Sequence, residues 1–424
     1  MVELRSIILA AGKGTRMKSD VPKVLQLICG YPIIHYPLVL TKAVRSLKNY
    51  IVLGHKGEAV QKYLSANYKI SMDFIEQKQQ NGTAHAVKCV VPKLKSFRGD
   101  VLILCGDTPL LETSTIKELI RKHRISKASV TFLTAVVREP FGYGRIIRDG
   151  HGRAAAIREE KDAQGIEKNI AEINVGVYCF KAQDLIEGLK KIKVNKLKGE
   201  YYLTDIIENF YGSGWKIETV ESDNVQEGLG VNTFVDLSVA EKVHRQKILR
   251  QHMLNGVKIL DPQTTFIDHN VSFGKDCVIY PYTFIHEDVK IGNNCVIGPF
   301  ARIRPATRLG DRVEVGNFTE ISRTKVGDEC FVKHFSFLGD AAIGKQVNVG
   351  AGTITANFDG KEKHKTRVGD GVFIGSDTVL IAPVTIGKKA KIGAGSVVTS
   401  RKKIPEHAVA MGVPAKVVER GKGK

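Results

Sequence analysis

Two glycines, an arginine and several lysines follow a short apolar run near the start of the chain, in IILAAGKGTRMKSDVPKVL (residues 7–25). Because Gly12 and Gly14 carry no side chains, the backbone N–H groups of such a loop can approach phosphate oxygens closely. Arg16 and Lys23 would add the positive charge that suits a triphosphate whose bond breaks. The stretch therefore predicts a phosphate-binding loop between a β-strand and a helix start.

Two other interpretations of this stretch are weaker. The apolar run is shorter than the core of a secretory signal, and Gly12-Lys13 interrupts it. A dinucleotide-binding fingerprint needs a third glycine, which this loop lacks. No apolar stretch elsewhere reaches 18 residues, so we expect no membrane span.

A carboxylate and an imidazole are the next candidates for chemistry. Asp107, in CGDTPLL, directly follows an apolar strand, where ligands of open α/β sheets bind. It could also simply cap the turn before Pro109. His334, in KHFSFLGDAAIG, could act as a general base, since imidazoles titrate near neutral pH. It could equally be an idle surface histidine.

Residues 1 to about 230 alternate apolar strands with helical stretches, which predicts a mainly parallel sheet covered on both faces. The expected strands are residues 6–11, 49–55, 72–77, 100–107, 129–137, 175–180 and 217–222, with helices at 113–125 and 183–192. A helical connector over about 233–254 would end at Asn255-Gly256.

After about Pro262 the pattern changes to aliphatic residues spaced by six, many of them followed by glycine. The two clearest series are Ile297, Ile303, Leu309, Val315 and Ile321, and Val368, Ile374, Leu380, Ile386, Ile392 and Val398. This period fits neither a 3.6-residue helix nor a hairpin and indicates a parallel β-helix. Between Val349 and Val368 the repeat is interrupted, and we expect a functional loop there.

Composition limits the remaining classes. The chain has 424 residues, and its formal charge of +20 suits either nucleic acid or anionic metabolites. No nucleic-acid-binding motif accompanies the spread-out cations, so we expect small anionic substrates and no nucleic acid. Seven scattered cysteines without a C-x-x-C pair favour a reducing, cytoplasmic setting.

Together these motifs resemble the sugar-1-phosphate nucleotidylyltransferases. Within that group the chain is most similar to the bifunctional N-acetylglucosamine-1-phosphate uridyltransferase/glucosamine-1-phosphate acetyltransferases, the GlmU type. The resemblance extends over nearly the whole chain and rests on the loop above together with QNGTAHAV (80–87), CGDTPLL (105–111), GYGRIIRD (142–149), EINVGVY (172–178), GEYYLTDII (199–207) and GVNT (230–233).

The resemblance implies roles for individual residues of the first half. Arg16 and Lys23 would be catalytic and grip the phosphates, and Asp107 and Asn232 would coordinate Mg²⁺. The uracil and ribose of UTP would be held by Leu9, Ala10, Gly12, Gln77, Gly82 and Thr83. Gly144, Glu159 and Asn174 would bind the amino-sugar phosphate.

It also implies an acetyltransferase site in the second half, with His334 as the base and Glu320 orienting it. Arg304, Asn348 and Lys363 would contact the sugar phosphate. Acetyl-CoA would lie along Ala351, Asn357, Ser376 and Ala394.

The chain departs from the family pattern in this second site. Ser322 stands where a phosphate-contacting lysine is usual, and Phe337 and Phe358 replace tyrosines. Gly412 stands where an arginine for coenzyme A is expected, and about two coils near the start of the β-helix are missing. From the six-residue register we expect Ser322 to face outward, towards the substrate.

The sequence thus predicts a Rossmann-like uridyltransferase domain (1–230), a linker helix (231–256) and a left-handed β-helix acetyltransferase domain (257–424). The expected substrates are UTP, amino-sugar 1-phosphates and acetyl-CoA, for the UDP-N-acetylglucosamine that enters peptidoglycan. The family also implies a homotrimer. The alternative is a monofunctional sugar-1-phosphate nucleotidylyltransferase whose β-helix serves only oligomerisation or regulation.

Overall fold

The computed structural model describes residues 2–195 and 199–418, and the chain forms two compact units, Met1–Glu241 and Lys242–Lys424. The connector predicted over about 233–254 is helix α8 (Phe234–Leu254), and Gly256 beyond its end has φ 92°. The division between the units falls inside α8, and the domain boundaries at 230 and 256 stay predictions. No helix in the described ranges combines the length and apolarity needed to cross a membrane.

A twisted, mainly parallel sheet forms the centre of the first unit, in the order β11–β7–β10–β6–β1–β4–β5. These strands are β1 (Leu4–Ala10), β4 (Lys48–Leu53), β5 (Met72–Glu76), β6 (Asp100–Cys105), β7 (Val130–Val136), β10 (Glu172–Lys181) and β11 (Ile217–Glu221). All seven expected strands are therefore present. Only β10 runs antiparallel to its neighbours in this path, and β8 (Arg145–Arg148) and β9 (Ala154–Arg158) extend from it.

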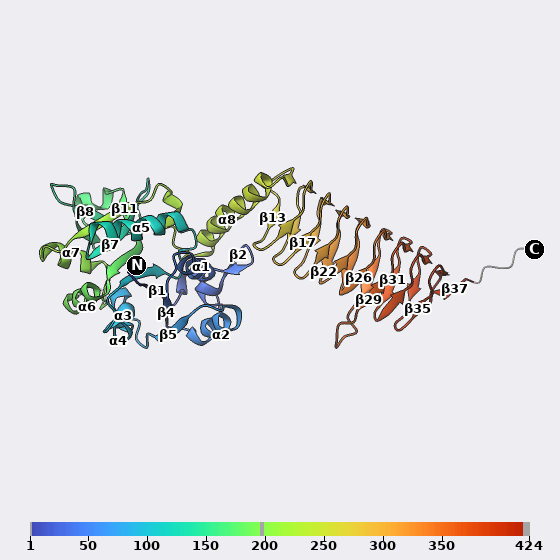
Figure 1. Ribbon diagram of the computed structural model, residues 1–424, viewed down its shortest axis with the longest axis horizontal. Coiled ribbons are helices and arrows are strands. Elements are labelled where there is room, and N and C mark those ends of the chain that lie inside the picture. The colour runs from blue at the N-terminus through green and yellow to red at the C-terminus, as the bar shows by residue number, and fades with distance from the viewer. Residues whose placement is uncertain (1, 196–198, 419–424) are drawn as a thin grey trace, which may run out of the picture. The chain divides into compact units, whose positions relative to one another are not determined.

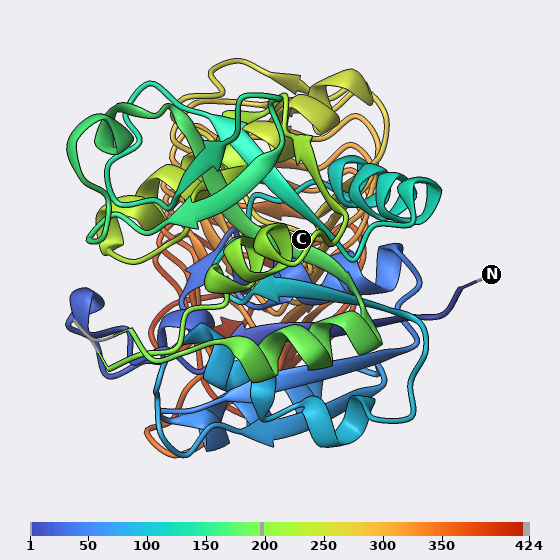
Figure 2. The ribbon, with the colours of Figure 1, turned by 90° about the vertical axis from the view of Figure 1, so that its left-hand side faces the viewer.

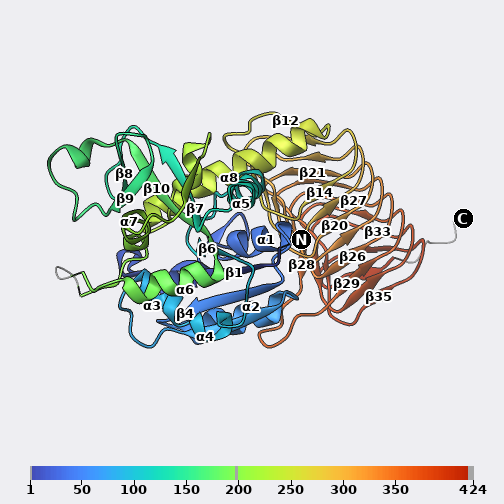
Figure 3. The ribbon, with the colours of Figure 1, turned by 60° about the vertical axis from the view of Figure 1, so that its left-hand side comes forward.

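Helices cover both faces of this sheet, as predicted, because successive strand residues point to opposite sides. Ile7 and Ile103 pack on one side with α3 (Thr83–Lys88), α4 (Val91–Leu94), α6 (Ala182–Lys191) and α7 (Asp205–Gly212). Ile8 and Leu104 pack on the other side with α1 (His35–Ala43), α2 (Gly57–Asn67) and α5 (Thr113–Ser126). Figure 2 and Figure 3 show these helical layers. Short 3₁₀ turns η1 (Thr15–Met17), η2 (Lys23–Leu25), η3 (Gly165–Asn169) and η4 (Val225–Gly228) and a small pair β2 (Leu27–Ile28) and β3 (Tyr31–Pro32) complete the unit.

The second unit is a left-handed parallel β-helix whose coils stack in register (Figure 1). Its first face consists of β12 (Lys258–Ile259), β15 (Val278–Ile279), β18 (Val296–Ile297), β21 (Glu314–Asn317), β24 (Phe331–His334), β27 (Asn348–Val349), β30 (Phe373–Ile374), β33 (Lys391–Ile392), β36 (Val409–Met411) and the antiparallel β37 (Lys416–Val417). The second face consists of β13 (Phe266–Ile267), β16 (Phe284–Ile285), β19 (Arg302–Ile303), β22 (Glu320–Ser322), β25 (Phe337–Gly339), β28 (Ile354–Ala356), β31 (Val379–Ile381) and β34 (Val397–Val398). The third face consists of β14 (Ser272–Phe273), β17 (Lys290–Ile291), β20 (Arg308–Leu309), β23 (Lys325–Val326), β26 (Ala341–Ile343), β29 (Thr366–Val368), β32 (Val384–Ile386) and β35 (Lys403–Ile404).

The residues spaced by six form the interior of this β-helix, since every member of both series is buried in its core. The interruption is shorter than the sequence indicates. Residues 350–356 still continue the coil and end in a regular strand, β28, in which Thr355 fills an interior position, and only the segment after Ala356 leaves the coil. Because this interior position holds a threonine and no aliphatic residue, the spacing of aliphatic residues does not indicate this coil.

The buried hydroxyl of Thr355 gives a test of this interior. Its Oγ1 accepts a 2.7 Å hydrogen bond from the Gly339 N–H group. Thr355→Val keeps the shape but leaves that N–H without a partner, so we expect a loss of about 1–3 kcal/mol in unfolding free energy. Thr399→Val, at an exposed threonine, is the matched control. Denaturant unfolding of the full chain measures both variants, and equal stability of Thr355→Val and wild type would contradict this account.

Candidate functional sites

Loops that follow parallel strands meet at one edge of the sheet in the first unit. Gly14 follows β1, Gln77 follows β5, Asp107 follows β6 and Asn232 lies beyond β11. Asn174 is near the amino end of β10, and because β10 is antiparallel this end lies at the same edge. Parallel pairing therefore gathers residues from five distant segments, where open α/β sheets bind ligands.

Four of the predicted residues form a connected polar group at this edge. The Lys23 ammonium pairs with the Asp107 carboxylate and also donates a 3.2 Å hydrogen bond to Asn232 Oδ1. The same amide oxygen accepts a 2.8 Å hydrogen bond from Arg16. The predicted phosphate-gripping and metal-binding residues thus lie together, although up to 216 positions separate them in the chain.

The segment that carries Asn232 is fixed to the strand end by backbone contacts. The Val231 N–H donates to the Asp107 carbonyl at 2.9 Å. The Asp236 carboxylate accepts from the N–H groups of Asn232 and Thr233 at 3.0 and 2.8 Å. Asn232 Nδ2 donates to a neighbouring carbonyl at 3.3 Å, which directs its Oδ1 towards the two cations.

The glycine loop has the geometry that the sequence indicates. Gly14 has φ 63°, and a Cβ atom there would lie 2.9 Å from Lys23 Cβ, so a side chain would displace that lysine. The loop borders a small hollow that also includes Lys13, His55 and Lys56. His55 and Lys56 were missed, because nothing in the sequence links the turn after β4 to the loop after β1.

The predicted base-binding residues also gather at this edge. Gln77 is buried and donates to the Gly82 carbonyl at 3.1 Å. Gly82 has φ 95°, and a Cβ atom there would come within 2.5 Å of the Tyr201 carbonyl. Thr83 accepts a 3.0 Å hydrogen bond from the Leu203 N–H. Leu9, Ala10 and Gly12 belong to the neighbouring end of β1 and its loop.

The three predicted sugar-binding residues lie on adjacent strands and their ends. The Asn174 N–H donates to the Gly144 carbonyl at 2.8 Å, and its side chain donates to the Tyr178 hydroxyl at 2.7 Å. Glu159 accepts a 2.8 Å hydrogen bond from Thr204. The Tyr178 and Thr204 partners were missed, although both lie within motifs that carry the resemblance.

Asp205, the first residue of α7, is a further group that was missed. Burial, followed by the nearby carboxylate of Glu159, raises the pKa of Asp205 to about 6. Cys105 lies two residues before Asp107, and burial raises its pKa to about 12. This thiol is therefore protonated at neutral pH and is no nucleophile.

Asp107 and Asn232 fit a magnesium ion by the chemistry of their donors. Both offer hard oxygen ligands, and the Lys23 ammonium contacts both oxygens, so a cation is already accommodated between them. Mg²⁺ in nucleotide sites typically takes one or two protein carboxylates together with substrate phosphates. Elsewhere in the described residues, Asp268, His286 and Glu287 also lie close together. The ring nitrogens of His286 already contact Asp268 and Arg302, at 3.2 and 3.3 Å.

In the β-helix, register aligns His334 with the predicted acetyl-CoA residues. The aligned pairs Val332↔Val349, Val349↔Ile374 and Ile374↔Ile392 are each followed two positions later by a residue of one exposed column. This acetyl column runs along the corner after the first face and consists of His334, Ala351, Ser376 and Ala394, with Gly412 as the next member. At about 4.8 Å a coil it extends about 19 Å.

The predicted partner of His334 is engaged elsewhere. Glu320 accepts a 2.8 Å hydrogen bond from Arg304 and lies 3.6 Å from Arg302, and the described residues show no contact between it and His334, so the expectation that it orients His334 stays a prediction. The His334 ring is exposed and makes no hydrogen bond among the residues that the structure describes. Arg302 and Arg304 contact the Glu320 carboxylate because they lie beside it in the preceding coil, whereas His334 lies at the corner.

Ser322 does not face the substrate side, contrary to expectation. Its side chain is fully buried, and its hydroxyl accepts a 2.8 Å hydrogen bond from Arg323. Arg323 has φ 49° and pairs with both oxygens of Asp340, at 2.7 and 2.8 Å. The chain turns at Ser322, so the alternation of a straight strand ends one residue earlier than the register implies.

The remaining predicted residues of the second site are dispersed. Asn348 lies in the outward row of the first face, between Phe331 and Phe373. Asn357 is buried at the next corner and donates to Asp340, away from the acetyl column. Lys363 is exposed on the protruding loop.

That protruding loop is held by Asp359. Its carboxylate accepts 2.8 Å hydrogen bonds from the N–H groups of Lys361 and Glu362 and contacts His364 at 2.7 Å. The Glu362 N–H, followed by His364, keeps the pKa of Asp359 well below its usual value. The loop that carries Lys363 is therefore locally ordered.

Exposed aromatic rings form a second column beside the acetyl column. Tyr282 stacks on Phe300 at 4.9 Å, and Phe300 stacks on Phe318 at 5.1 Å. All three have positive φ, which is costly for bulky side chains. The same column continues to Phe335, next to His334. Large apolar rings held exposed at this cost indicate a surface that another molecule covers.

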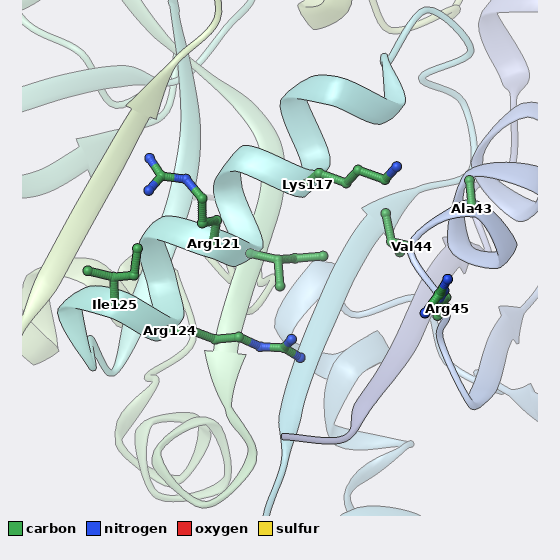
Figure 4. A pocket seen from close by; sticks show the side chains of 8 residues that line it. Ala43, Val44, Arg45, Lys117, Arg121, Arg124 and Ile125 are labelled. Carbon is green, nitrogen blue, oxygen red and sulfur yellow. The ribbon is translucent and has the colours of Figure 1, made fainter. Parts of the chain in front are cut away.

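A surface pocket of about 520 Å³ lies between α1 and α5 of the first unit (Figure 4). Its cations are partly engaged, since Arg124 pairs with Asp100 and Arg121 with Glu118, both at 2.7 Å. It contains none of the predicted site residues.

Comparison with known proteins matches both units. Residues 5–224 match the nucleotidyl transferase family, and residues 270–305, 288–323 and 365–400 match the bacterial transferase hexapeptide (six repeats) family. A bifunctional protein GlmU of Pelotomaculum thermopropionicum is 43% identical over 416 residues, covering 90% of each chain. Its counterparts in Shouchella clausii and Geotalea uraniireducens are 40% and 39% identical, covering 96% and 99% of this chain and 95% and 99% of theirs.

The raised pKa of Asp205 predicts how stability depends on pH. Below about pH 3 the carboxyl is protonated in the folded and the unfolded chain, so the Asp205 charge makes no difference between Asp205→Asn and wild type there. As pH rises towards 6 the unfolded carboxyl ionises first, and wild type should lose stability relative to the variant. Above about pH 7 the variant should keep a constant advantage. Melting temperatures between about pH 3 and pH 8 measure this, with Asp223→Asn at an exposed site as control; a pH-independent difference would contradict it.

Proposed function

The chain belongs to the family of bifunctional GlmU proteins, and on that premise we propose that it makes UDP-N-acetylglucosamine in two reactions, one on each unit. The β-helix transfers acetyl from acetyl-CoA to glucosamine-1-phosphate. The first unit then transfers UMP from UTP to N-acetylglucosamine-1-phosphate and releases pyrophosphate. The observation that carries the proposal is the convergence of Arg16, Lys23, Asp107 and Asn232 at the sheet edge.

Uridyl transfer needs alignment and charge stabilisation more than acid–base chemistry. An oxygen of the sugar 1-phosphate attacks the α-phosphorus of UTP, and the bond to the leaving pyrophosphate breaks. The attacking phosphate is already ionised, so no protein base is required. Lys23 and Arg16 stabilise the negative charge that gathers on the phosphates, and the glycine loop donates backbone N–H groups.

Substrate selection in this unit depends on the flanking groups. Gln77, Gly82 and Thr83 bind the uracil and ribose. Gly144, Glu159 and Asn174 bind the amino sugar, with Thr204 holding Glu159 at 2.8 Å. These assignments follow the family, and their support here is that all six residues lie at the edge where the phosphate loop ends.

Magnesium is the proposed cofactor, with Asp107 and Asn232 as its protein ligands. When bound it supplies positive charge at the phosphates that Lys23 and Arg16 also face. Asp107 and Asn232 would hold the ion, and Lys23, whose ammonium contacts both of their oxygens here, would stabilise the charge of the triphosphate.

Acetyl transfer uses the corner column of the β-helix. His334 removes a proton from the sugar ammonium, the freed amine attacks the thioester carbonyl, and the C–S bond breaks to release coenzyme A. Ala351, Ser376 and Ala394 leave a row of small side chains along which the thioester arm can lie. Arg304, Asn348 and Lys363 are the proposed contacts to the sugar phosphate.

The same surfaces support a homotrimer in which each acetyl site is completed by a neighbour. The side chains proposed for the sugar phosphate lie on different faces of one chain, and the aromatic column next to His334 is exposed. Association would bury these rings and bring the dispersed groups together. All seven cysteines are free thiols, which agrees with a cytoplasmic enzyme.

Asp107→Ala should slow uridyl transfer by about 100-fold or more, the scale of losing one preorganised electrostatic group. Acetyl transfer should continue, because His334 belongs to the other unit. The assay follows UDP-N-acetylglucosamine from UTP and N-acetylglucosamine-1-phosphate, with Asp223→Ala as the control. Near-normal uridyl transfer by Asp107→Ala would remove this residue from the site.

His334→Ala should lower acetyl transfer by about 10²–10⁴-fold, the usual contribution of a general base, while uridyl transfer persists. His407→Asn, which alters another exposed corner histidine, is the control. The products are followed by mass spectrometry with glucosamine-1-phosphate, acetyl-CoA and UTP, each omitted in turn. If wild type does not acetylate, the monofunctional alternative holds.

A further inference from the structure

The three faces of the β-helix present different side chains to the outside. Because the coils pair in register, each outward position forms a row. The row of the third face is Ser272, Lys290, Arg308, Lys325, Ala342, Arg367, Thr385 and Lys403. It contains five cations and no acid, so positive charge is concentrated on this face.

The other two outward rows are mainly apolar. The first face presents Lys258, Val278, Val296, Glu314, Phe331, Asn348, Phe373, Lys391 and Val409. The second presents Phe266, Phe284, Arg302, Glu320, Phe337, Ile354, Val379 and Val397. The cationic row is thus a property of one face and does not follow from the general excess of lysine.

The charge is densest at the C-terminal end of the third face, where β29, β32 and β35 border a groove of about 300 Å³. Figure 3 labels β29 and β35 in this stack. Besides Pro383, Val384 and Thr385, the groove is lined by Lys365, Arg367, Arg401, Lys402 and Lys403. We call these five residues the basic cluster.

The basic cluster has no acidic partner among the described residues. All five side chains are exposed, and within the described ranges none of them forms an ion pair. Some cations elsewhere on the β-helix do find partners: Arg308 pairs with Asp288 at 2.7 Å and Lys345 with Asp328 at 2.9 Å. Five unpaired cations around one groove repel one another, so an external anion would offset the cost.

The extent of the row decides what kind of anion fits. Arg367 and Lys403 are two coils apart, about 10 Å, and Lys325 extends the row to about 19 Å. A single phosphate is too small to contact such a row. The row also contains no aromatic side chain on which nucleic-acid bases could stack. A surface that carries many separate anionic groups can contact all the outward cations of a flat sheet face at once.

We propose that the third face of the β-helix, through its basic cluster, docks the protein on an anionic phospholipid surface. The contact is electrostatic and peripheral, because no apolar side chain of the row inserts into the bilayer. The cytoplasmic leaflet carries the negative surface potential that attracts such clusters, and each lysine or arginine near it strengthens binding about fivefold. This attachment is independent of either reaction.

Vesicle sedimentation of the full-length protein tests the proposal. Wild type is mixed with vesicles of phosphatidylcholine alone or with 40% phosphatidylglycerol, at low and at high salt. The variant Arg367→Gln/Arg401→Gln/Lys403→Gln removes three charges from the cluster and leaves every proposed catalytic residue intact. The control Lys62→Gln/Lys69→Gln/Lys216→Gln removes three exposed, unpaired lysines from the described part of the first unit.

We expect wild type and the control to bind only the anionic vesicles, and only at low salt, since counterions screen such contacts. The cluster variant should bind about 100-fold more weakly and keep its uridyl transfer. Equal binding by the cluster variant and the control, or no binding by wild type at low salt, would overturn the proposal. A parallel titration uses a single-stranded oligonucleotide; cluster-dependent submicromolar binding to it at physiological salt would assign the face to nucleic acid instead.

Discussion

Hydrogen bonding between parallel strands aligns residues at equivalent positions, and both units obtain their functional surfaces from that alignment. In the first unit the carboxyl ends of β1, β5, β6 and β11 share one edge, so the loops that follow them meet. In the β-helix each coil repeats the one before it, so residues at one position of the repeat form a column in which neighbours are about 4.8 Å apart. The acetyl column and the row of the third face arise in the same way.

The lysine and arginine side chains of the two units differ in the partners that compensate their charge. At the sheet edge Lys23 faces Asp107, and Asn232 Oδ1 accepts from both Lys23 and Arg16, so these two cations have partners within the protein. On the β-helix Arg304 and Arg323 are held by Glu320 and Asp340. The five cations of the basic cluster line one groove and have no ion-pair partner among the described residues, which is why we assign the cluster an external one.

These contacts explain one departure from the family pattern in the second site, the serine at position 322. A lysine at position 322 would have to leave the buried corner, whereas serine fits it and accepts a hydrogen bond from Arg323. The guanidinium of Arg323 is in turn fixed by Asp340, which Asn357 also contacts. The corner thus forms one connected network, and the substitution at 322 belongs to it. Nothing in the structure explains the absence of an arginine at Gly412.

Local signals in the sequence were sufficient for the elements and for the chemistry of the main loop. Apolar runs that alternate with helical stretches predicted all seven strands of the central path, because buried parallel strands are continuously apolar. The six-residue period marked the β-helix because every sixth side chain must fill its interior. Only tertiary structure decided which groups face one another. Burial, followed by the carboxylate of Glu159, a residue 46 positions away, raises the pKa of Asp205. Glu320 contacts Arg302 and Arg304 because parallel pairing puts Arg302 directly beside it. Ser322 turns inward where a corner ends the alternation, and Thr355 fills the core through a hydrogen bond to the preceding coil. These outcomes depend on contacts between distant segments, and no period or motif within one segment records them.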